Sequence, residues 1–153
     1  SEWVEFYIKE ALQCYNTNCM EAAVIMLGLA SEKIIDEELD ALLEYLSRYF
    51  NTEFLQMKSE MVNKNKASEK FNCYKKYFDK IKNNVSDPEF KKMLPLVDKV
   101  AFQAYANFTR ITRNELAHPS DSKMERIEVL MIFISFIKYC QIQYGFIDYF
   151  INH

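Results

Sequence analysis

Residues that break helices are scarce in this sequence. Its 153 residues include only two glycines and three prolines. Folds built from short strands need many such residues at their turns, so the scarcity excludes them and favours long helices. Half of the residues are hydrophobic, which is enough for one sizeable core. We therefore expect an all-α fold, with a single domain spanning residues 1–153 and no internal repeat.

Groups that bind metals are also few. The four cysteines, Cys14, Cys19, Cys73 and Cys140, form no Cys-x-x-Cys pair, and there are only two histidines. Because zinc ligands normally come in closely spaced pairs, we expect neither a metal site nor another cofactor. The sequence contains no disulfide framework and no signal peptide, which favours a reducing cytoplasm. A first residue other than methionine suggests a piece of a longer protein.

The hydrophobic runs are too short to cross a bilayer. In the last predicted helix the uninterrupted run is Val129–Ile137, whereas a membrane-spanning helix needs about 20 apolar residues. Lys138, Gln141, Gln143 and Asp148 interrupt its continuation. We therefore expect a buried core helix here and no membrane partner.

The charge is modest overall but unevenly distributed. A net charge of −3 argues against broad, non-specific affinity for nucleic acids. Residues 58–99 nevertheless contain eleven lysines against six acidic residues, whereas residues 1–57 are strongly acidic. The middle segment can present a basic face, or its lysines can simply solvate a helix surface. The lysines that lie close together are Lys64, Lys66, Lys70, Lys75, Lys76, Lys80 and Lys82.

Apolar residues recur at helical spacing along the first part of the chain. The pattern predicts a helix over residues 2–15, a break at residues 16–18, and a second helix over residues 19–35. We expect Asn18 to cap the second helix, with Glu21 as its reciprocal partner. The chain should therefore begin with two helices joined by a short turn.

The helical pattern continues to the end of the sequence. It predicts a helix over residues 38–62 and another from Ser68, as its cap, to about Lys82. Asp87 should cap a helix that has Pro88 at its first position. A further helix should run from Pro95 to about Ala117. The capping box Ser122–Glu125 should open a final apolar helix that ends near residue 150.

The residues that carry chemistry lie at the end of the helix predicted over Pro95–Ala117. His118 precedes Pro119, and a residue before proline is pushed out of the α conformation. The helix should therefore end near residue 117 and leave His118 at its exit. Because the C-terminal end of a helix favours a protonated imidazole, this position helps His118 to hold a proton near neutral pH.

Three polar side chains share one stripe of this helix. Arg110, Asn114 and His118 follow one another at intervals of four residues. Arg113 lies roughly 140° around an ideal helix from His118. The two would converge through the break at Pro119, or through pairing with another chain.

The segment Arg113-Asn114-Glu115-Leu116-Ala117-His118 resembles the signature of the HEPN family. That signature is an arginine, a polar residue directly after it, and a histidine four to six residues after the arginine. Residues 14–39 resemble the second-helix region of HEPN domains, and an apolar helix after the motif also fits. The residues that carry this second likeness are Tyr15, Ala22, Ala23, Leu27 and Glu32. The resemblance implies an HEPN-like bundle of about five or six helices that dimerises through the motif-bearing helices.

Many HEPN domains are metal-independent endoribonucleases of toxin–antitoxin, abortive-infection or related defence systems. The resemblance implies that Arg113 stabilises charge on the scissile phosphate, His118 shuttles protons, and Asn114 orients or contacts the phosphate. Glu32 can hold Arg113 or Arg110 in place, or can simply be solvated. The implied partners are RNA, a second copy of the chain, and an antitoxin or a fused or neighbouring partner domain.

Two other hypotheses remain open. Some HEPN domains have lost catalysis, so the chain can be a non-catalytic module for dimerisation or for binding a nucleotide or partner protein. The motif can also be a coincidence in a generic helical scaffold.

Overall fold

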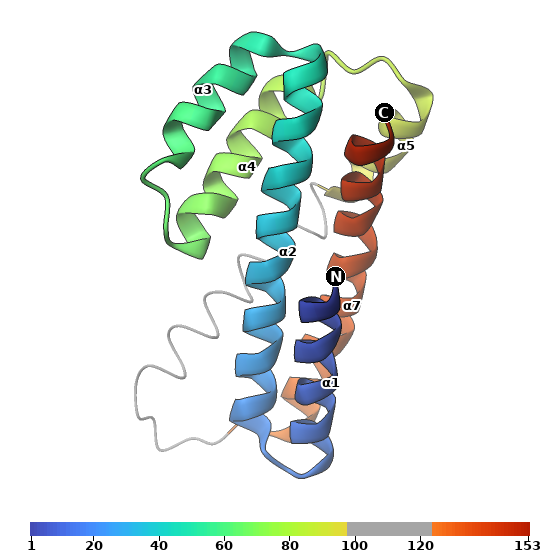
Figure 1. The fold of residues 1–153 in the computed structure, drawn as a ribbon. Coiled ribbons are helices and arrows are strands. Elements are labelled where there is room, and N and C mark those ends of the chain that lie inside the picture. Colours follow the sequence, from blue (N-terminus) through green and yellow to red (C-terminus); the bar gives the residue numbers. More distant parts are fainter. Residues whose placement is uncertain (98–123) are drawn as a thin grey trace. The chain divides into compact units, whose positions relative to one another are not determined.

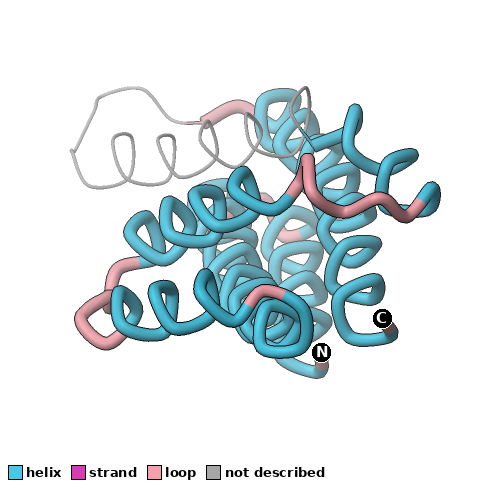
Figure 2. The backbone as a smooth tube through the Cα atoms, turned by 90° about the horizontal axis from the view of Figure 1, so that it is seen from above, coloured by secondary structure: helices cyan, strands magenta, loops and turns pink. Residues whose placement is uncertain are grey.

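The protein is helical throughout the part that the structure describes. The computed structural model describes residues 1–97 and 124–153. Six helices occupy these ranges, and no strand occurs in them (Figure 1, Figure 2). They are α1 Glu2–Asn16, α2 Met20–Tyr49, α3 Asn51–Met61, α4 Ala67–Ile81, α5 Pro88–Leu96 and α7 Arg126–Asn152. For these residues the prediction of an all-α bundle of five or six helices is confirmed.

The end of α1 explains the turn that precedes α2. Asn18 has a φ of 64°, the left-handed conformation that asparagine tolerates better than most residues. The N–H of Asn18 donates to the Tyr15 carbonyl at 3.1 Å, and the N–H of Cys19 donates to the Cys14 carbonyl at 2.8 Å. These two bonds form a Schellman motif. The prediction that Asn18 caps α2 is wrong, because α2 begins at Met20 and the first bond into it runs from the Ala23 N–H to the Cys19 carbonyl.

The second helix, α2, is a single helix of 30 residues. The predicted end near Ile35 is wrong, because the charged residues 36–38 that follow include no glycine or proline to stop it. The helix ends at Tyr49, and Phe50, with φ −138° and ψ 67°, separates it from α3. The prediction of one helix over residues 38–62 is wrong at Phe50, where no helix-breaking residue signals the change.

The helices α3 and α4 lie side by side as an antiparallel pair (Figure 1). α4 begins at Ala67, so Ser68 lies in its first turn and not at the predicted cap. The backbone N–H of Lys66 donates to the carboxylate of Glu69 at 3.3 Å. The helix is thus capped at Lys66, two residues earlier than the predicted cap at Ser68.

The start of α5 follows the prediction. The Asp87 carboxylate accepts a hydrogen bond from the Glu89 N–H at 2.9 Å, and Pro88 occupies the first position. Pro95 lies inside α5 and not at the start of a new helix, so that predicted boundary is wrong. The cap at Asp87 had already started the helix, and a proline near its end removes one N–H only. The rest of the predicted helix, residues 98–117, lies outside the described residues.

The last helix, α7, begins at Arg126, later than the capping box at Ser122 predicted. Ser122 itself lies outside the described residues. The N–H of Glu125 donates to the carboxylate of Glu128 at 3.2 Å. The side chain that caps the first turn of α7 is therefore that of Glu128, whereas the predicted capping box assigned this role to Glu125.

The chain forms two compact units. Among the described residues, one unit contains residues 1–34 and 124–141, and the other contains residues 35–97 and 142–153. α2 and α7 each contribute to both units. That residues 1–153 fold as one domain stays a prediction.

Aromatic side chains fill the core of the unit formed by residues 35–97 and 142–153. Phe90 of α5 is fully buried and lies 5.6 Å from Phe146 and 5.2 Å from Tyr149 between ring centroids. Phe78 of α4 meets Phe146 edge-on at 5.1 Å. Each such buried ring contributes about 1.5–3 kcal/mol by leaving water. This cluster holds the beginning of α5 against the last turns of α7.

Candidate functional site

The predicted catalytic segment lies outside the described residues. Arg110, Arg113, Asn114 and His118 all fall within residues 98–123, so their roles stay predictions. Glu32, the other member of the predicted set, is exposed on α2. Its predicted contact with Arg113 or Arg110 likewise stays a prediction.

The start of α7, which follows this segment, is anchored to α1. Nη1 of Arg126 donates to the Tyr15 carbonyl at 2.9 Å, and the guanidinium lies 4.2 Å from the Tyr15 ring centroid. The Tyr15 ring meets Phe133 edge-on at 5.7 Å. A cation at the C-terminal end of α1 also interacts favourably with the dipole of that helix. Arg126 therefore fixes the start of α7 against the end of α1.

The first half of α7 has one buried and one exposed apolar face. Val129, Phe133, Phe136 and Tyr139 are buried. Five apolar side chains on the other face, here called the α7 stripe, are between 40% and 63% exposed. The stripe consists of Ile127, Leu130, Met131, Ile134 and Ile137. The predicted core helix is thus buried on one side only over residues 126–141.

By length and composition, α7 is also apolar enough to cross a membrane. Its most apolar 18-residue window has a mean hydropathy of 1.4, and 33% of that window is buried. Core helices of soluble proteins satisfy the same criterion. The cytoplasmic location therefore stays a prediction.

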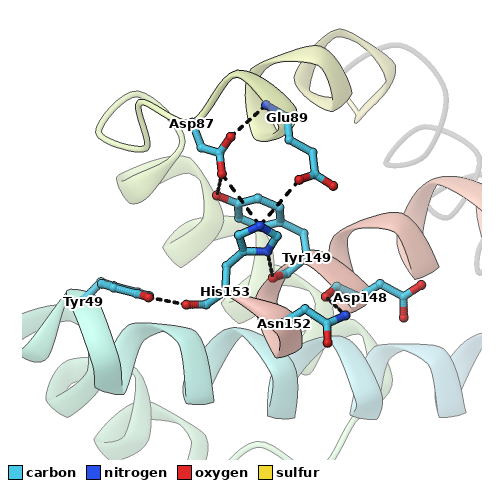
Figure 3. Close-up of polar contacts among 7 residues, drawn as sticks. All are labelled: Tyr49, Asp87, Glu89, Asp148, Tyr149, Asn152 and His153. Carbon is cyan, nitrogen blue, oxygen red and sulfur yellow. Dashed lines mark hydrogen bonds and ion pairs between the residues drawn. The ribbon is translucent and has the colours of Figure 1, made fainter.

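A cluster of potential metal ligands lies where α5 begins and α7 ends (Figure 3). It consists of Asp87, Glu89 and His153, each with one ligand atom within 4.8 Å of the others. Nε2 of His153 lies 3.5 Å from the Glu89 carboxylate and 3.9 Å from the Asp87 carboxylate. The three side chains therefore surround one point at the surface.

The imidazole of His153 is held in a defined orientation. Its ring stacks on Tyr149 with centroids 4.2 Å apart, and Nδ1 lies 3.0 Å from the Tyr149 carbonyl. A carbonyl only accepts hydrogen bonds, so Nδ1 carries the hydrogen and Nε2 points at the two carboxylates. The hydroxyl of Tyr49 donates to the backbone carbonyl of His153 and ties this end of the chain to α2 (Figure 3).

The carboxylate of Asp87 is fixed by two donors. It accepts from the Glu89 N–H at 2.9 Å and from the Tyr149 hydroxyl at 3.0 Å. These two hydrogen bonds, together with the nearby imidazole of His153, lower the pKa of Asp87. Burial and the same bond to Asp87 raise the pKa of Tyr149, which therefore stays a neutral donor. Asp87 is thus an oriented, ionised carboxylate at neutral pH.

Sequence reasoning missed this cluster. Asp87 was predicted only as a helix cap, and neither Glu89 nor His153 was singled out. Short ligand spacing would have been the usual signal, but His153 is far from the other two residues in the sequence. The packing of Phe90 against Tyr149 brings the three together.

The basic face predicted for the middle segment is partly neutralised. Three of its lysines form ion pairs with acidic residues, and Nζ of Lys80 donates to Gln56 at 3.2 Å. The pairs are Lys70 with Asp36 at 2.7 Å, Lys76 with Glu60 at 2.5 Å, and Lys82 with Asp79 at 3.0 Å. Lys70, Lys76 and Lys80 join α4 to other helices, whereas Lys82 pairs within the end of α4. α4 therefore does not present an unbroken basic surface for nucleic acid.

Buried polar groups lie in the core of the unit formed by residues 35–97 and 142–153. Glu38 of α2 is fully buried, and Tyr74 of α4 is 1% exposed. Burial, and next the charge of Glu38, raise the pKa of Tyr74 well above its usual value. Tyr74 therefore stays neutral and supplies a hydroxyl to this part of the core.

Comparison with protein-family models, with curated proteins and with solved structures found no match to this chain. The HEPN resemblance therefore stays a prediction, which depends on the motif and on the helical architecture.

Proposed function

We propose that the chain is a homodimeric, metal-independent endoribonuclease of the HEPN type, acting in the cytoplasm as part of a toxin–antitoxin, abortive-infection or related defence system. Arg113, Asn114 and His118 carry the chemistry. Arg110 and Glu32 support the site.

One observation carries the proposal. The arginine-polar-histidine motif at 113–118 precedes a long apolar helix, α7, which begins at Arg126, and the described part of the chain is all-helical. The contact between Arg126 and Tyr15 gives further support to the proposal. This contact joins the start of α7 to residues 14–39, which resemble the second-helix region of HEPN domains.

The proposed residues suit RNA cleavage because RNA supplies its own nucleophile. The 2′-hydroxyl attacks the adjacent phosphorus, the bond to the 5′-oxygen breaks, and a 2′,3′-cyclic phosphate remains. A base must take the 2′ proton, an acid must protonate the leaving 5′-oxygen, and positive charge must stabilise the phosphorane. His118 suits both proton transfers, and Arg113 binds phosphate oxygens in a fork while keeping its charge.

A dimer supplies what one chain lacks. Two proton transfers are served best by two histidines, and a two-fold axis through the motif would provide two copies of His118. The exposed α7 stripe offers an apolar surface to a second copy. Such a surface is unusual in a monomer.

The alternative is a non-catalytic HEPN module that dimerises or binds a nucleotide or a partner protein. The partial neutralisation of the α4 lysines favours this reading, because it removes positive charge that RNA binding would use.

The test is to incubate the purified chain with total cellular RNA in EDTA and to map the new RNA ends. We expect discrete cuts ending in cyclic phosphates, which are lost in His118→Ala and in Arg113→Ala. Lys91→Ala is the matched control, because it also removes one exposed cation but from α5, outside the motif. It should cut like the unmodified chain.

The outcomes separate the hypotheses. Cuts that persist in His118→Ala, or that need an added metal ion, would contradict the proposed mechanism. If no variant differs from the unmodified chain in the RNA assay but all of them dimerise, the binding module is favoured. A monomer that tolerates both substitutions would mean that the motif is a coincidence.

A further inference from the structure

We propose that Asp87, Glu89 and His153 form a binding site for one divalent transition-metal ion of the zinc class, which joins the start of α5 to the end of α7 (Figure 3). The ion would have a structural role. The site uses none of the residues proposed for RNA cleavage.

The first argument is the spacing of the ligand atoms. Donor atoms bound to a tetrahedral zinc ion by bonds of about 2.0–2.1 Å lie roughly 3.3–3.5 Å apart. Nε2 of His153 lies 3.5 Å from the Glu89 oxygen and 3.9 Å from the Asp87 oxygen. All ligand atoms of the cluster lie within 4.8 Å of one another, so rotation of the exposed Glu89 and His153 side chains can bring them to bonding distance, and solvent could supply a fourth ligand.

The second argument is electrostatic. Nδ1 of His153 donates to the Tyr149 carbonyl, so Nε2 is the nitrogen that faces the two carboxylates, and in the neutral ring it carries the lone pair. Three electron-rich atoms at this separation repel one another unless a positive charge lies among them. A proton on Nε2 is the competing source of that charge. Charge-assisted N–H···O bonds are usually about 2.7–2.9 Å, however, which is shorter than both separations observed here.

The third argument is the outer shell. Carboxylate and histidine ligands in metal sites are usually oriented by further hydrogen bonds, and both the carboxylate of Asp87 and the imidazole of His153 are held in this way. Asp87 accepts from the Tyr149 hydroxyl and the Glu89 N–H, while His153 is held through Nδ1 and by stacking on Tyr149. The partial positive charge at the start of α5, about half an elementary charge, opposes cation binding, but two carboxylates outweigh it.

The test is to titrate Zn²⁺ into the metal-free whole chain, following heat and the ¹⁵N signals of the histidine ring. The His118→Ala background leaves His153 as the sole histidine, so the signal is unambiguous and does not depend on RNase activity. We expect one Zn²⁺ per chain, a shift at Nε2 and not at Nδ1, and a higher Tm with Zn²⁺.

Four variants locate the ion. His153→Ala and Glu89→Gln should weaken Zn²⁺ binding more than 10-fold. Tyr149→Phe, which keeps the stacked ring but removes one outer-shell donor, should weaken it about 10–100-fold. Asp148→Asn is the matched control, because it removes an exposed carboxylate of α7 next to the site but outside the cluster, and it should bind like the unmodified chain (Figure 3).

Two results would overturn the proposal. One is an Nε2 signal that does not respond to Zn²⁺, which would mean that a proton alone neutralises the cluster. The other is equal Zn²⁺ affinity in Glu89→Gln, His153→Ala and Asp148→Asn, which would place the ion elsewhere, for example at the exposed Cys19.

Discussion

At the scale of single residues, Glu60 is the main polar link between α3 and α4. Its carboxylate accepts from Nζ of Lys76 at 2.5 Å and from the hydroxyl of Tyr77 at 2.8 Å. The bond from Lys76, and next the bond from Tyr77, lower the pKa of Glu60. Because the folded-state pKa is lowered, the stabilisation is present above the unfolded-state pKa and is lost as pH falls through the folded value.

We predict that Glu60→Gln lowers the free energy of unfolding by about 0.5–1 kcal/mol at pH 7, which is typical of a largely solvated ion pair. The glutamine oxygen still accepts from Tyr77, so the substitution isolates the charge. The deficit should shrink as pH falls below 4.5, the usual pKa of the group. Urea unfolding at pH 7 and at pH 3 measures it. An equal deficit at both pH values would mean that charge is not the cause.

At the scale of elements, the ends of helices depend on backbone geometry as much as on residue type. α1 ends where Asn18 adopts a left-handed conformation, and α2 ends at Tyr49, before an aromatic residue, Phe50, in a non-helical conformation. Asparagine is a common residue in the left-handed conformation that ends a helix, so the end of α1 has a sequence signal. The change of direction at Phe50 has no local sequence signal, although it separates α3 from α2.

We predict that Asn18→Ala destabilises the protein by about 1 kcal/mol, because a β-carbon is strained in the left-handed region. Asn18→Gly, the matched control, should be neutral or slightly stabilising, because glycine adopts this conformation without strain. Thermal unfolding of both variants measures the difference. Equal stability of the two would mean that the Schellman turn does not require the left-handed residue.

At the scale of the whole molecule, the α7 stripe is the surface on which the proposed dimer depends. Met131 is the most exposed of its members, at 63%. A charge placed there would lie in an apolar interface without a partner and would cost several kcal/mol of association energy.

We predict that the unmodified chain sediments as a dimer at micromolar concentration and that Met131→Glu sediments as a monomer. Leu55→Glu is the matched control, because it places the same charge on an apolar side chain of α3 that is also exposed. It should remain a dimer. Sedimentation equilibrium measures the oligomeric state of the three proteins. A monomeric unmodified chain would contradict the proposed dimer.

The sequence by itself determined the helical class of the described residues, the extent of α1 and the start of α5, but not most of the other helix boundaries. The scarcity of glycine and proline and the spacing of apolar residues are local properties, and so is the cap formed by Asp87 and Pro88. The motif at 113–118 is also local, and so it was readable from the sequence alone.

The tertiary structure alone decided which distant residues meet. Asp87 and His153 come together because Phe90 packs on Tyr149, and Arg126 reaches Tyr15 because α7 packs on α1. It also decided that the α4 lysines bind acidic residues of other helices and that one face of α7 remains exposed. Such contacts depend on how side chains from separate helices fill a shared space, and no pattern within a single helix encodes that.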